Sequence, residues 1–350
     1  MRASRVSNLV LREGYRTVGR RVLFNSFGGD PEKIHEVMIG TLSRAPKASR
    51  ATKAHPVTVA GIRFPNRVGL AAGLDKDGLA AHAWARFGFG FAELGTVTAR
   101  AQPGNPSPRL FRLRSSQAII NRMGFNNAGA QALADRLKAK GLRRGSGPIP
   151  LGISIGKTKV VQLADATEDY LVSLRIVAPY ADYVAINVSS PNTPGLRSLQ
   201  DSRELAGLVG ALTAEASVLD SDPVPVFVKL APDLTPREAS EVVSVVESMG
   251  ASGLIATNTT LSRDGIRPPD AALRAEAGGL SGRPLTRRAR DCVARLRDAT
   301  ELPIMGAGGI MTPADAAAMF DAGADLVQLY TGFIYEGPAL IHGINHLLED

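Results

Sequence analysis

The sequence predicts an α/β protein, a (β/α)₈ TIM barrel preceded by a small amphipathic helical hairpin. From about residue 66 onward, one unit recurs: a short apolar run, a polar loop and a helical pattern. The eight apolar runs span residues 68–73, 91–96, 151–156, 183–189, 226–231, 253–259, 303–309 and 326–332. Continuous apolar runs that alternate with helices are typical of parallel strands buried on both faces. Eight units are what a closed barrel needs, and a doubly wound open sheet is the alternative.

Amphipathic patterns between these runs predict the helices that surround the barrel. They span residues 127–140, 201–219, 235–249, 286–299 and 312–322. Two connections are longer, at residues 97–126 and 260–285, and long loops in compact folds are usually functional or disordered. Residues 109–120 alternate in a strand-like pattern, so we expect the first connection to be ordered and to cover the site.

The composition is that of a soluble globular protein, with 44% hydrophobic and 21% charged residues among 350. Cys292 is the single cysteine, so no internal disulfide can form, and a reducing, cytosolic environment is expected. No apolar run approaches the length of about eighteen residues that a spanning helix needs, and no signal-peptide pattern follows the early arginines. We therefore expect a chain that does not cross a membrane.

Positive charge is concentrated in the amino-terminal part of the chain. Residues 1–53 contain eleven Lys and Arg against four Asp and Glu, which gives +7, whereas the other 297 residues carry +1. A nucleic-acid-binding protein would more often show a basic stripe with a matching motif, and none occurs here. An anionic membrane surface fits this segment better, so we expect a peripheral protein at the cytoplasmic face of the cell membrane.

Residues 1–45 are predicted to form a helical arm for membrane and quinone access, and residues 46–350 the catalytic barrel. Gly28 and Gly29 end a first helical pattern, and Asp30 is placed to cap a second one that begins at Pro31. Two short helices that are each apolar on one side and rich in arginine are typical of an interfacial hairpin. A hairpin that only covers the barrel is the alternative.

Polar residues follow nearly every predicted strand, where the loops of such barrels carry the chemistry. The richest cluster is residues 187–193, in which two amides and three hydroxyls surround Pro191. A Ser/Asn-rich turn alone would account for this cluster, but the polar ends of the other strands favour a ligand site. Lys76 and Lys229 end apolar runs, which predicts an anion or an electron-rich cofactor beside them, or lysines at the rim. Gly308 and Gly309 are suited to a phosphate.

Several sequence motifs resemble those of class 2 dihydroorotate dehydrogenases, the membrane-associated, quinone-dependent enzymes of pyrimidine synthesis. The resemblance runs from about residue 10 to the end, and the motifs are AAGLDK (71–76), ELGTVT (93–98), NRMGFNN (121–127), NVSSPNTPGLR (187–197), ATNTT (256–260), GGLSGRPL (278–285) and VQLYTG (327–332). It implies an FMN-binding (β/α)₈ barrel that oxidises dihydroorotate to orotate and passes the electrons to a membrane quinone.

The resemblance also implies the site residues. Ser190 corresponds to the catalytic base, a position at which class 1 relatives have cysteine. The implied substrate ligands are Lys76, Asn121, Arg122, Met123, Gly124, Phe125, Asn187, Asn192, Asn258 and Thr259. The implied FMN ligands are Ala72, Gly73, Leu74, Asp75, Lys76, Thr96, Ser154, Asn187, Lys229, Thr257, Gly282, Gly309, Tyr330 and Thr331. Ser154 departs from the family, which usually has asparagine there.

The reaction implied by the resemblance removes a proton from C5 of dihydroorotate and a hydride from C6. Serine is a poor base at its free pKa, so it needs a proton relay, for which Thr193 and Phe125 are candidates, and a dry site. The alternatives are a class 1-like flavin barrel that uses fumarate or NAD, a Schiff-base aldolase that uses Lys229, and a phosphate-binding barrel without redox activity. No His, Asp or Glu cluster has metal-ligand spacing.

Overall fold

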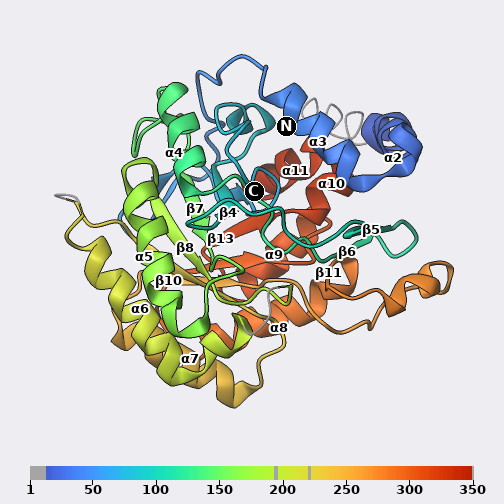
Figure 1. The fold of residues 1–350 in the computed structure, drawn as a ribbon. Helices are drawn as coiled ribbons and strands as arrows, with labels where there is room; N and C mark the ends of the chain where they lie inside the picture. Colours follow the sequence, from blue (N-terminus) through green and yellow to red (C-terminus); the bar gives the residue numbers. More distant parts are fainter. Residues whose placement is uncertain (1–12, 193–195, 220–221, 349–350) are drawn as a thin grey trace.

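The computed structural model describes residues 13–192, 196–219 and 222–348 (Figure 1). Eight parallel strands close into one barrel, so the predicted closed sheet is confirmed and the open sheet is wrong. In order around the barrel they are β3 (Val68–Leu70), β4 (Phe91–Val97), β7 (Leu151–Ile155), β8 (Tyr183–Asn187), β9 (Val226–Leu230), β10 (Gly253–Ala256), β12 (Ile304–Ala307) and β13 (Leu326–Leu329). Seven of the eight predicted runs contain one of these strands, and β4 extends one residue beyond the remaining run, at 91–96.

Helices pack around the outside of the barrel, and the five predicted ones are confirmed. They are α4 (Ala130–Ala139), α6 (Ser202–Ala216), α7 (Pro236–Ser248), α8 (Thr286–Arg297) and α9 (Pro313–Asp321), to which the structure adds α5 (Ala166–Val177), α10 (Thr331–Glu336) and α11 (Pro338–Leu347). Helix α7 illustrates the local rules. Thr235 and Glu238 form a capping box at its start, and its apolar face is buried.

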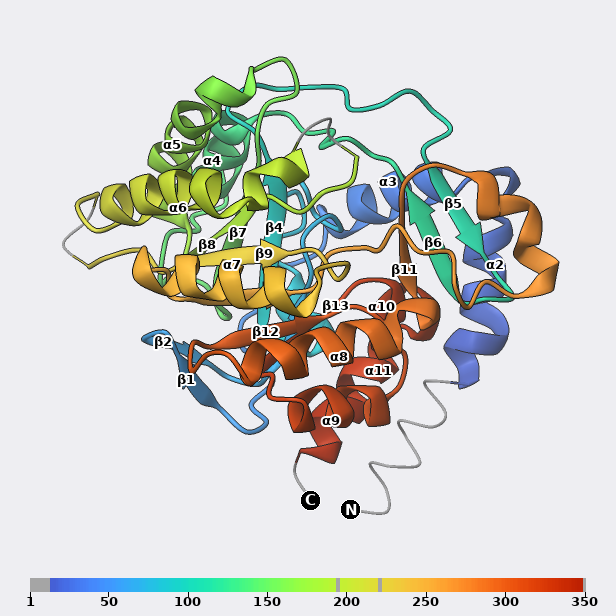
Figure 2. The ribbon, with the colours of Figure 1, turned by 90° about the horizontal axis from the view of Figure 1, so that it is seen from below.

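The barrel interior is filled by aromatic side chains at its amino-terminal end. Phe91, Tyr183 and Phe227 are fully buried there in one apolar cluster. A Cβ atom on Gly152 would lie 2.1 Å from the Tyr183 ring, so only glycine fits on the neighbouring strand. The hairpin of β1 (Val57–Val59) and β2 (Ile62–Phe64) closes this end from outside (Figure 2).

The two long connections meet in a small antiparallel sheet beside the carboxyl ends of the barrel strands. Strands β5 (Leu110–Leu113) and β6 (Ala118–Asn121) come from the first connection, and β11 (Gly279–Gly282) comes from the second. The prediction that residues 109–120 are ordered and strand-like is therefore confirmed. Asn121 at the end of β6 pairs with Gly279 at the start of β11, so this sheet places residues of both connections side by side.

The arm packs against this small sheet and against helix α10 (Figure 2). It consists of a π-helical turn (Tyr15–Gly19), α2 (Arg20–Asn25), a 3₁₀ turn (Ser26–Gly29) and α3 (Pro31–Leu42). The predicted cap is confirmed, since the Asp30 side chain accepts hydrogen bonds from the backbone N–H groups of Glu32 and Lys33. Residues 1–12 lie outside the described part. Within the described part, no helix is long and apolar enough to span a bilayer.

Candidate active site

A pocket opens at the carboxyl ends of the barrel strands, as the sequence predicts for this fold. We call it the central pocket. Its polar lining comes from residues at or just after seven of the eight strands and from the small sheet: Ala72, Gly73, Lys76, Thr96, Asn121, Asn187, Ser190, Asn192, Lys229, Thr257, Asn258, Thr259, Ser281, Gly282, Gly308, Gly309, Gln328, Tyr330 and Thr331. Residues distant in sequence therefore converge because parallel strands bring their carboxyl ends to one face.

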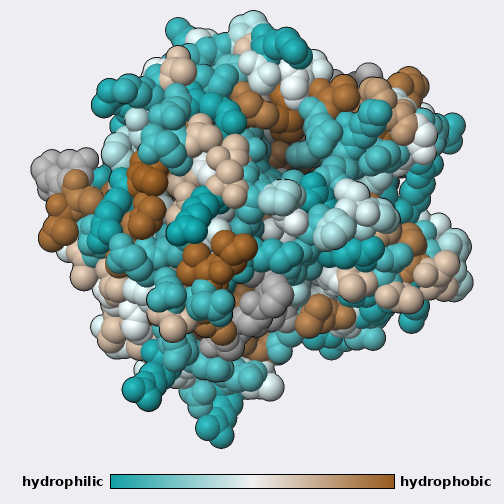
Figure 3. All heavy atoms as spheres, viewed as in Figure 1, coloured by the Kyte–Doolittle hydropathy of each residue, from teal (hydrophilic) through white to brown (hydrophobic). Residues whose placement is uncertain are grey.

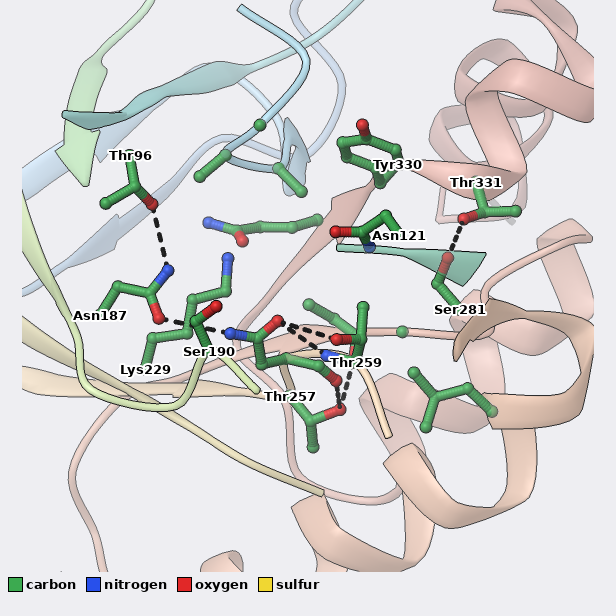
Figure 4. Close-up of a pocket in the computed structure, with 18 of the residues that line it drawn as sticks. Thr96, Asn121, Asn187, Ser190, Lys229, Thr257, Thr259, Ser281, Tyr330 and Thr331 are labelled. Carbon is green, nitrogen blue, oxygen red and sulfur yellow. Dashed lines mark hydrogen bonds between the residues drawn. The ribbon is translucent and has the colours of Figure 1, made fainter. Parts of the chain in front are cut away.

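Polar side chains at the strand ends form a continuous hydrogen-bond network (Figure 4). Asn187 donates from Nδ2 to Thr96 Oγ1 at 3.1 Å, and its Oδ1 accepts from Asn258 Nδ2 at 3.3 Å. Asn258 Nδ2 also donates to Ser189 Oγ at 3.0 Å. The backbone of this asparagine cluster is held as well, because the buried Tyr170 hydroxyl donates to the Asn187 carbonyl oxygen at 3.0 Å. The amides are thereby fixed in orientation before a ligand arrives.

Ser190 lies on the loop after β8 and is 6% exposed, with its side chain in the central pocket. Its Oγ accepts a hydrogen bond from the backbone N–H of Asn192 at 3.3 Å. Asn192 Nδ2 in turn donates to Asn121 Oδ1 at 3.2 Å, which joins this loop to the end of β6. The arrangement gives a nearly dry hydroxyl surrounded by amide groups that can both donate and accept.

Residues 123–125 cover the pocket next to Ser190. Gln102 Nε2 donates to the carbonyl oxygens of Gly124 and Phe125, each at 3.0 Å. Phe125 has φ of 54°, in the left-handed region that a bulky residue rarely adopts. Such conformations persist only where the surroundings hold them, and here two hydrogen bonds from one side chain do so.

A buried ion pair adjoins the central pocket, and its lysine, Lys229, lines that pocket. Lys229 Nζ lies 3.4 Å from Glu93 Oε1, and the two side chains are 7% and 0% exposed. Glu93 Oε2 accepts from Gln328 Nε2 at 2.7 Å and from the Tyr183 hydroxyl at 3.2 Å. Gln328 Oε1 is buried and has no hydrogen-bond partner among the described residues. This region therefore offers a lysine and an unpaired acceptor to a ligand.

Lys76 lies at the side of the pocket nearest the arm. The pKa of its ammonium group is lowered to about 8, mainly by burial and to a smaller extent by the charge of Arg109. The carboxylates of Glu32, Asp77 and Glu36 act in the opposite direction. Two of these carboxylates belong to helix α3, so the arm contributes to the electrostatics of the central pocket.

Most residues that the resemblance implies come together in the central pocket, and four do not. Leu74 is fully buried in the core, and Asp75 accepts hydrogen bonds from Trp84 Nε1 and the Ala80 N–H. Ser154 lies behind Thr96, with 2.9 Å between their hydroxyl oxygens. Arg122 points away from the pocket to Glu276 at 2.6 Å. The first three support the residues that line the pocket, whereas Arg122 holds the surrounding loops together.

The structure adds residues that sequence reasoning missed. Glu93 and Gln328 are the chief ones, and each is a polar side chain inside an otherwise apolar strand. That break in the apolar pattern was the available signal. Ser281 was also missed; its hydroxyl lies 2.8 Å from that of Thr331 and joins β11 to the start of α10 (Figure 4). Thr193, a candidate for the proton relay, lies outside the described residues.

A second, apolar cavity of about 370 Å³ lies between the arm and the barrel. We call it the arm cavity. Its lining comes from α2, α3, the small sheet and α10, and includes Leu23, Phe24, Ile34, His35, Met38, Leu110, Phe111, Arg112, Tyr330, Phe333 and Ile334. Burial lowers the pKa of His35 to about 3, which keeps its imidazole neutral. Tyr330 lines both the arm cavity and the central pocket.

Comparisons with known proteins agree with this geometry. The sequence profile of the dihydroorotate dehydrogenase family matches residues 55–350. A dihydroorotate dehydrogenase (quinone) from Salinispora arenicola is 56% identical over 341 residues, which cover 93% of this chain and 96% of the relative. The corresponding protein of Chloroflexus aurantiacus is 50% identical over 351 residues, covering 95% and 96%.

A solved structure supports the same family assignment. The crystal structure of the Eimeria tenella DHODH in complex with ferulenol superposes with a TM-score of 0.85 at 35% identity, and covers 93% of each chain. The likeness thus includes the helices before the barrel as well as the barrel itself. The chain therefore belongs to the dihydroorotate dehydrogenase family, as a member of its quinone-dependent class 2, which acts in pyrimidine biosynthesis.

Proposed function

We propose that this chain oxidises (S)-dihydroorotate to orotate, with FMN as the hydride acceptor and a membrane quinone as the final electron acceptor. The observation that carries the proposal is the position of Ser190. Its hydroxyl is nearly dry and faces a pocket into which four amide side chains project, from Asn121, Asn187, Asn192 and Asn258. A small planar ligand with a carboxylate and several carbonyl and N–H groups fits such a set of donors and acceptors.

The central pocket fits FMN on three counts. Lys229 and the unpaired oxygen of Gln328 suit a heteroaromatic ring that has both acceptor and donor atoms on its edge. Thr96, Asn187 and Thr257 surround the same region. Gly282, Gly309 and Thr331 leave backbone accessible for a phosphate, a common arrangement near strands 7 and 8 of such barrels. FMN, when bound, supplies the hydride acceptor for C6 of the substrate.

The protein's own groups then handle the proton and the substrate. Ser190 Oγ takes the proton from C5 while its own hydroxyl proton passes to the relay, for which Thr193 and Phe125 are the candidates. The backbone N–H of Asn192 donates to Ser190 Oγ and fixes the orientation of the hydroxyl. The four asparagines orient the ring, and the Lys76 ammonium pairs with its carboxylate. Phe125 and Met123 exclude water on the open side. Serine at this position favours the quinone-dependent reaction over the class 1 alternative, and the Lys229–Glu93 ion pair is inconsistent with an aldolase lysine.

A spectrum tests the oxidoreductase proposal as a whole. Purified protein, or protein incubated with FMN and desalted, should show flavin absorbance. Anaerobic dihydroorotate should bleach that absorbance, and a quinone should restore it. Protein that stays colourless after incubation with FMN would refute the proposal and leave the non-redox phosphate-binding barrel.

The pKa of Lys76 predicts how the binding of orotate depends on pH. Below pH 8 the lysine is charged and can pair with the orotate carboxylate; above pH 8 it is neutral in the free protein. The dissociation constant should therefore rise as pH increases through 8, approaching about tenfold per pH unit. Titrations followed by flavin absorbance between pH 7 and 9 measure this dependence. Lys76→Met should bind orotate weakly at every pH; a flat profile in the wild type would contradict the assignment.

The arm is proposed as the route by which quinone reaches the flavin from the cytoplasmic face of the cell membrane. The arm cavity is apolar and is separated from the central pocket by Tyr330. Val18, Val22, Phe27 and Val37 on the arm are 44–64% exposed, an apolar face that a membrane interface would cover. Apolar surface also gathers beside the arm helices in the space-filling view (Figure 3). The high positive charge of residues 1–53 favours anionic lipid.

Charge placed on this face should weaken membrane binding selectively. We expect Val18→Glu/Val22→Glu to bind anionic vesicles at least about tenfold more weakly, because apolar contact is lost and acidic lipid repels the new carboxylates. Turnover with a long-tailed quinone in those vesicles should fall in parallel, while a short-tailed, soluble quinone should react as before. Val160→Glu is the matched control, since Val160 is 73% exposed on the barrel. Equal vesicle binding by both variants would contradict the proposal.

A further inference from the structure

Asn105 joins the two chain segments that carry the proposed substrate ligands. Its Nδ2 donates to the carbonyl oxygen of Arg122 at 3.0 Å and to that of Asn192 at 3.1 Å. Arg122 directly follows Asn121, and the Asn192 N–H holds Ser190 Oγ. Asn105 does not line the central pocket, so it acts on these residues from behind. One amide group thus fixes the distance between the end of β6 and the loop after β8.

The position of Asn105 is itself tightly defined. Its backbone N–H donates to the Met123 carbonyl oxygen at 3.0 Å. A Cβ atom on Gly124 would lie 2.7 Å from the Asn105 side chain, and one on Gly104 would lie 2.3 Å from the Met123 carbonyl oxygen. The Asn105 Oδ1 accepts from Lys159 Nζ at 2.9 Å on the exposed side. The two halves of the amide therefore have separate partners. The nitrogen donates to the carbonyl oxygens of Arg122 and Asn192, and the oxygen accepts from the surface residue Lys159.

An ion pair connects this turn to the arm. Arg109 Nη1 donates to the carbonyl oxygens of Pro103 and Asn105, at 2.6 and 2.8 Å. Its Nε and Nη2 donate to Glu32 Oε1 at 2.9 and 2.7 Å. Both side chains are largely buried, at 14% and 16% exposure. Planar guanidinium–carboxylate pairs of this kind fix geometry as well as charge. Glu32 lies in the first turn of α3, so the arm supports the turn at Asn105.

We propose that Asn105 is a positioning residue for the Ser190 loop, and that the Glu32–Arg109 ion pair extends this support to the arm. The proposal rests on the proposed role of Ser190 as the base. Without the Asn105 amide, the carbonyl oxygens of Arg122 and Asn192 would bind water, and the loop could move relative to β6. A displacement of about 1 Å at the reacting groups can reduce the rate about 10²-fold. The dihydroorotate half-reaction therefore depends on a residue outside the pocket and on a helix of the arm.

The test is anaerobic rapid mixing of the FMN-bound protein with dihydroorotate. Asn105→Asp keeps the shape and the Lys159 contact but loses both donors, so flavin reduction should slow about 10- to 100-fold. Lys159→Met is the matched control, because it removes only the bond to Oδ1 and should stay within about twofold of the wild type. Asn105→Asp that reduces its flavin at the wild-type rate would overturn the proposal.

The combination with Ser190→Ala separates this proposal from the assignment of the base. If Asn105 acts through Ser190, Asn105→Asp/Ser190→Ala should be about as slow as Ser190→Ala alone. Rate losses that multiply would show that Asn105 does not act through Ser190. A wild-type rate in Ser190→Ala would instead refute the assignment of Ser190 as the base. Hydrogen exchange would then test whether Asn105 holds the loop. That readout is independent of turnover: the amides of Ser189, Ser190 and Asn192 should exchange faster in Asn105→Asp than in the wild type, and at the wild-type rate in Lys159→Met.

The link to the arm has its own variant. Glu32→Gln removes the charge of the pair but keeps its size, and should slow flavin reduction in the same direction by a smaller factor, about threefold to tenfold. Vesicle binding should be unchanged, because Glu32 lies on the side of α3 that faces the barrel. A wild-type reduction rate in Glu32→Gln would confine the positioning function to Asn105 and remove the arm from it.

Discussion

Ser190→Ala is expected to bind FMN and orotate almost as the wild type does, yet to reduce its flavin about 10²–10⁴-fold more slowly with dihydroorotate. The hydroxyl contributes proton removal, whereas the surrounding asparagines, which orient the ligand, remain. Within the described part of the chain, the substitution removes one hydrogen bond, in which Ser190 Oγ accepts from the Asn192 N–H. The effect should therefore fall on the rate of the chemical step and not on binding.

Single-turnover reduction under anaerobic conditions measures that step directly, and orotate titration reports binding in the same sample. Ser190→Cys should retain part of the rate, since class 1 relatives use a thiol at this position. Reduction of Ser190→Ala at the wild-type rate would mean that another group removes the proton. A loss confined to orotate affinity would make Ser190 a binding residue.

The barrel was predictable because its signal is local. Each strand is a continuous apolar run and each is followed by a polar loop, so the eight strands and most pocket residues could be assigned in order. Because the carboxyl ends of the strands in a closed barrel meet at one face, the strand assignment alone predicts that Asn187, Lys229 and Thr257 lie close together. The cap of α3 at Asp30 followed from an equally local pattern.

Contacts that depend on closure of the barrel could not be predicted in this way. Glu93 of β4 contacts Lys229 of β9 and Gln328 of β13 only across the barrel interior. Within a motif, the sequence also does not say which residues of a turn face the ligand. Thus Ala72, Gly73 and Lys76 line the central pocket, while Leu74 and Asp75 turn into the core.

The arm shows a third limit of sequence reasoning. Its amphipathic pattern and its helix cap could be predicted from the sequence, but the contacts that attach it to the catalytic side of the barrel could not. Glu32 reaches Arg109, and the Tyr15 hydroxyl donates to the Ile334 carbonyl oxygen at 2.8 Å. These partners are 77 and 319 residues away along the chain. We therefore propose two roles for the arm, support of the dihydroorotate site and quinone access.

The buried pair of Lys229 and Glu93 predicts the other large effect. Lys229→Met should destabilise the protein by about 3–5 kcal/mol, because it leaves the fully buried Glu93 carboxylate without its cation. The hydroxyl of Tyr183 and the amide of Gln328 still donate to that carboxylate but do not neutralise it. The same substitution removes a group proposed to contact FMN, so flavin content should also fall.

Lys229→Met/Glu93→Gln separates these two effects. Both Lys229 variants lack the same FMN contact, so any stabilisation by bound flavin is lost equally from each. The double variant should nevertheless recover most of the lost free energy of unfolding, because a neutral amide can accept from Tyr183 and Gln328 without burying a charge. Urea unfolding of the wild type, both single variants and the double variant measures the coupling between the two side chains. If the double variant is no more stable than Lys229→Met, the carboxylate is not left unpaired by loss of the lysine. Lys229 would then act on stability through the flavin alone.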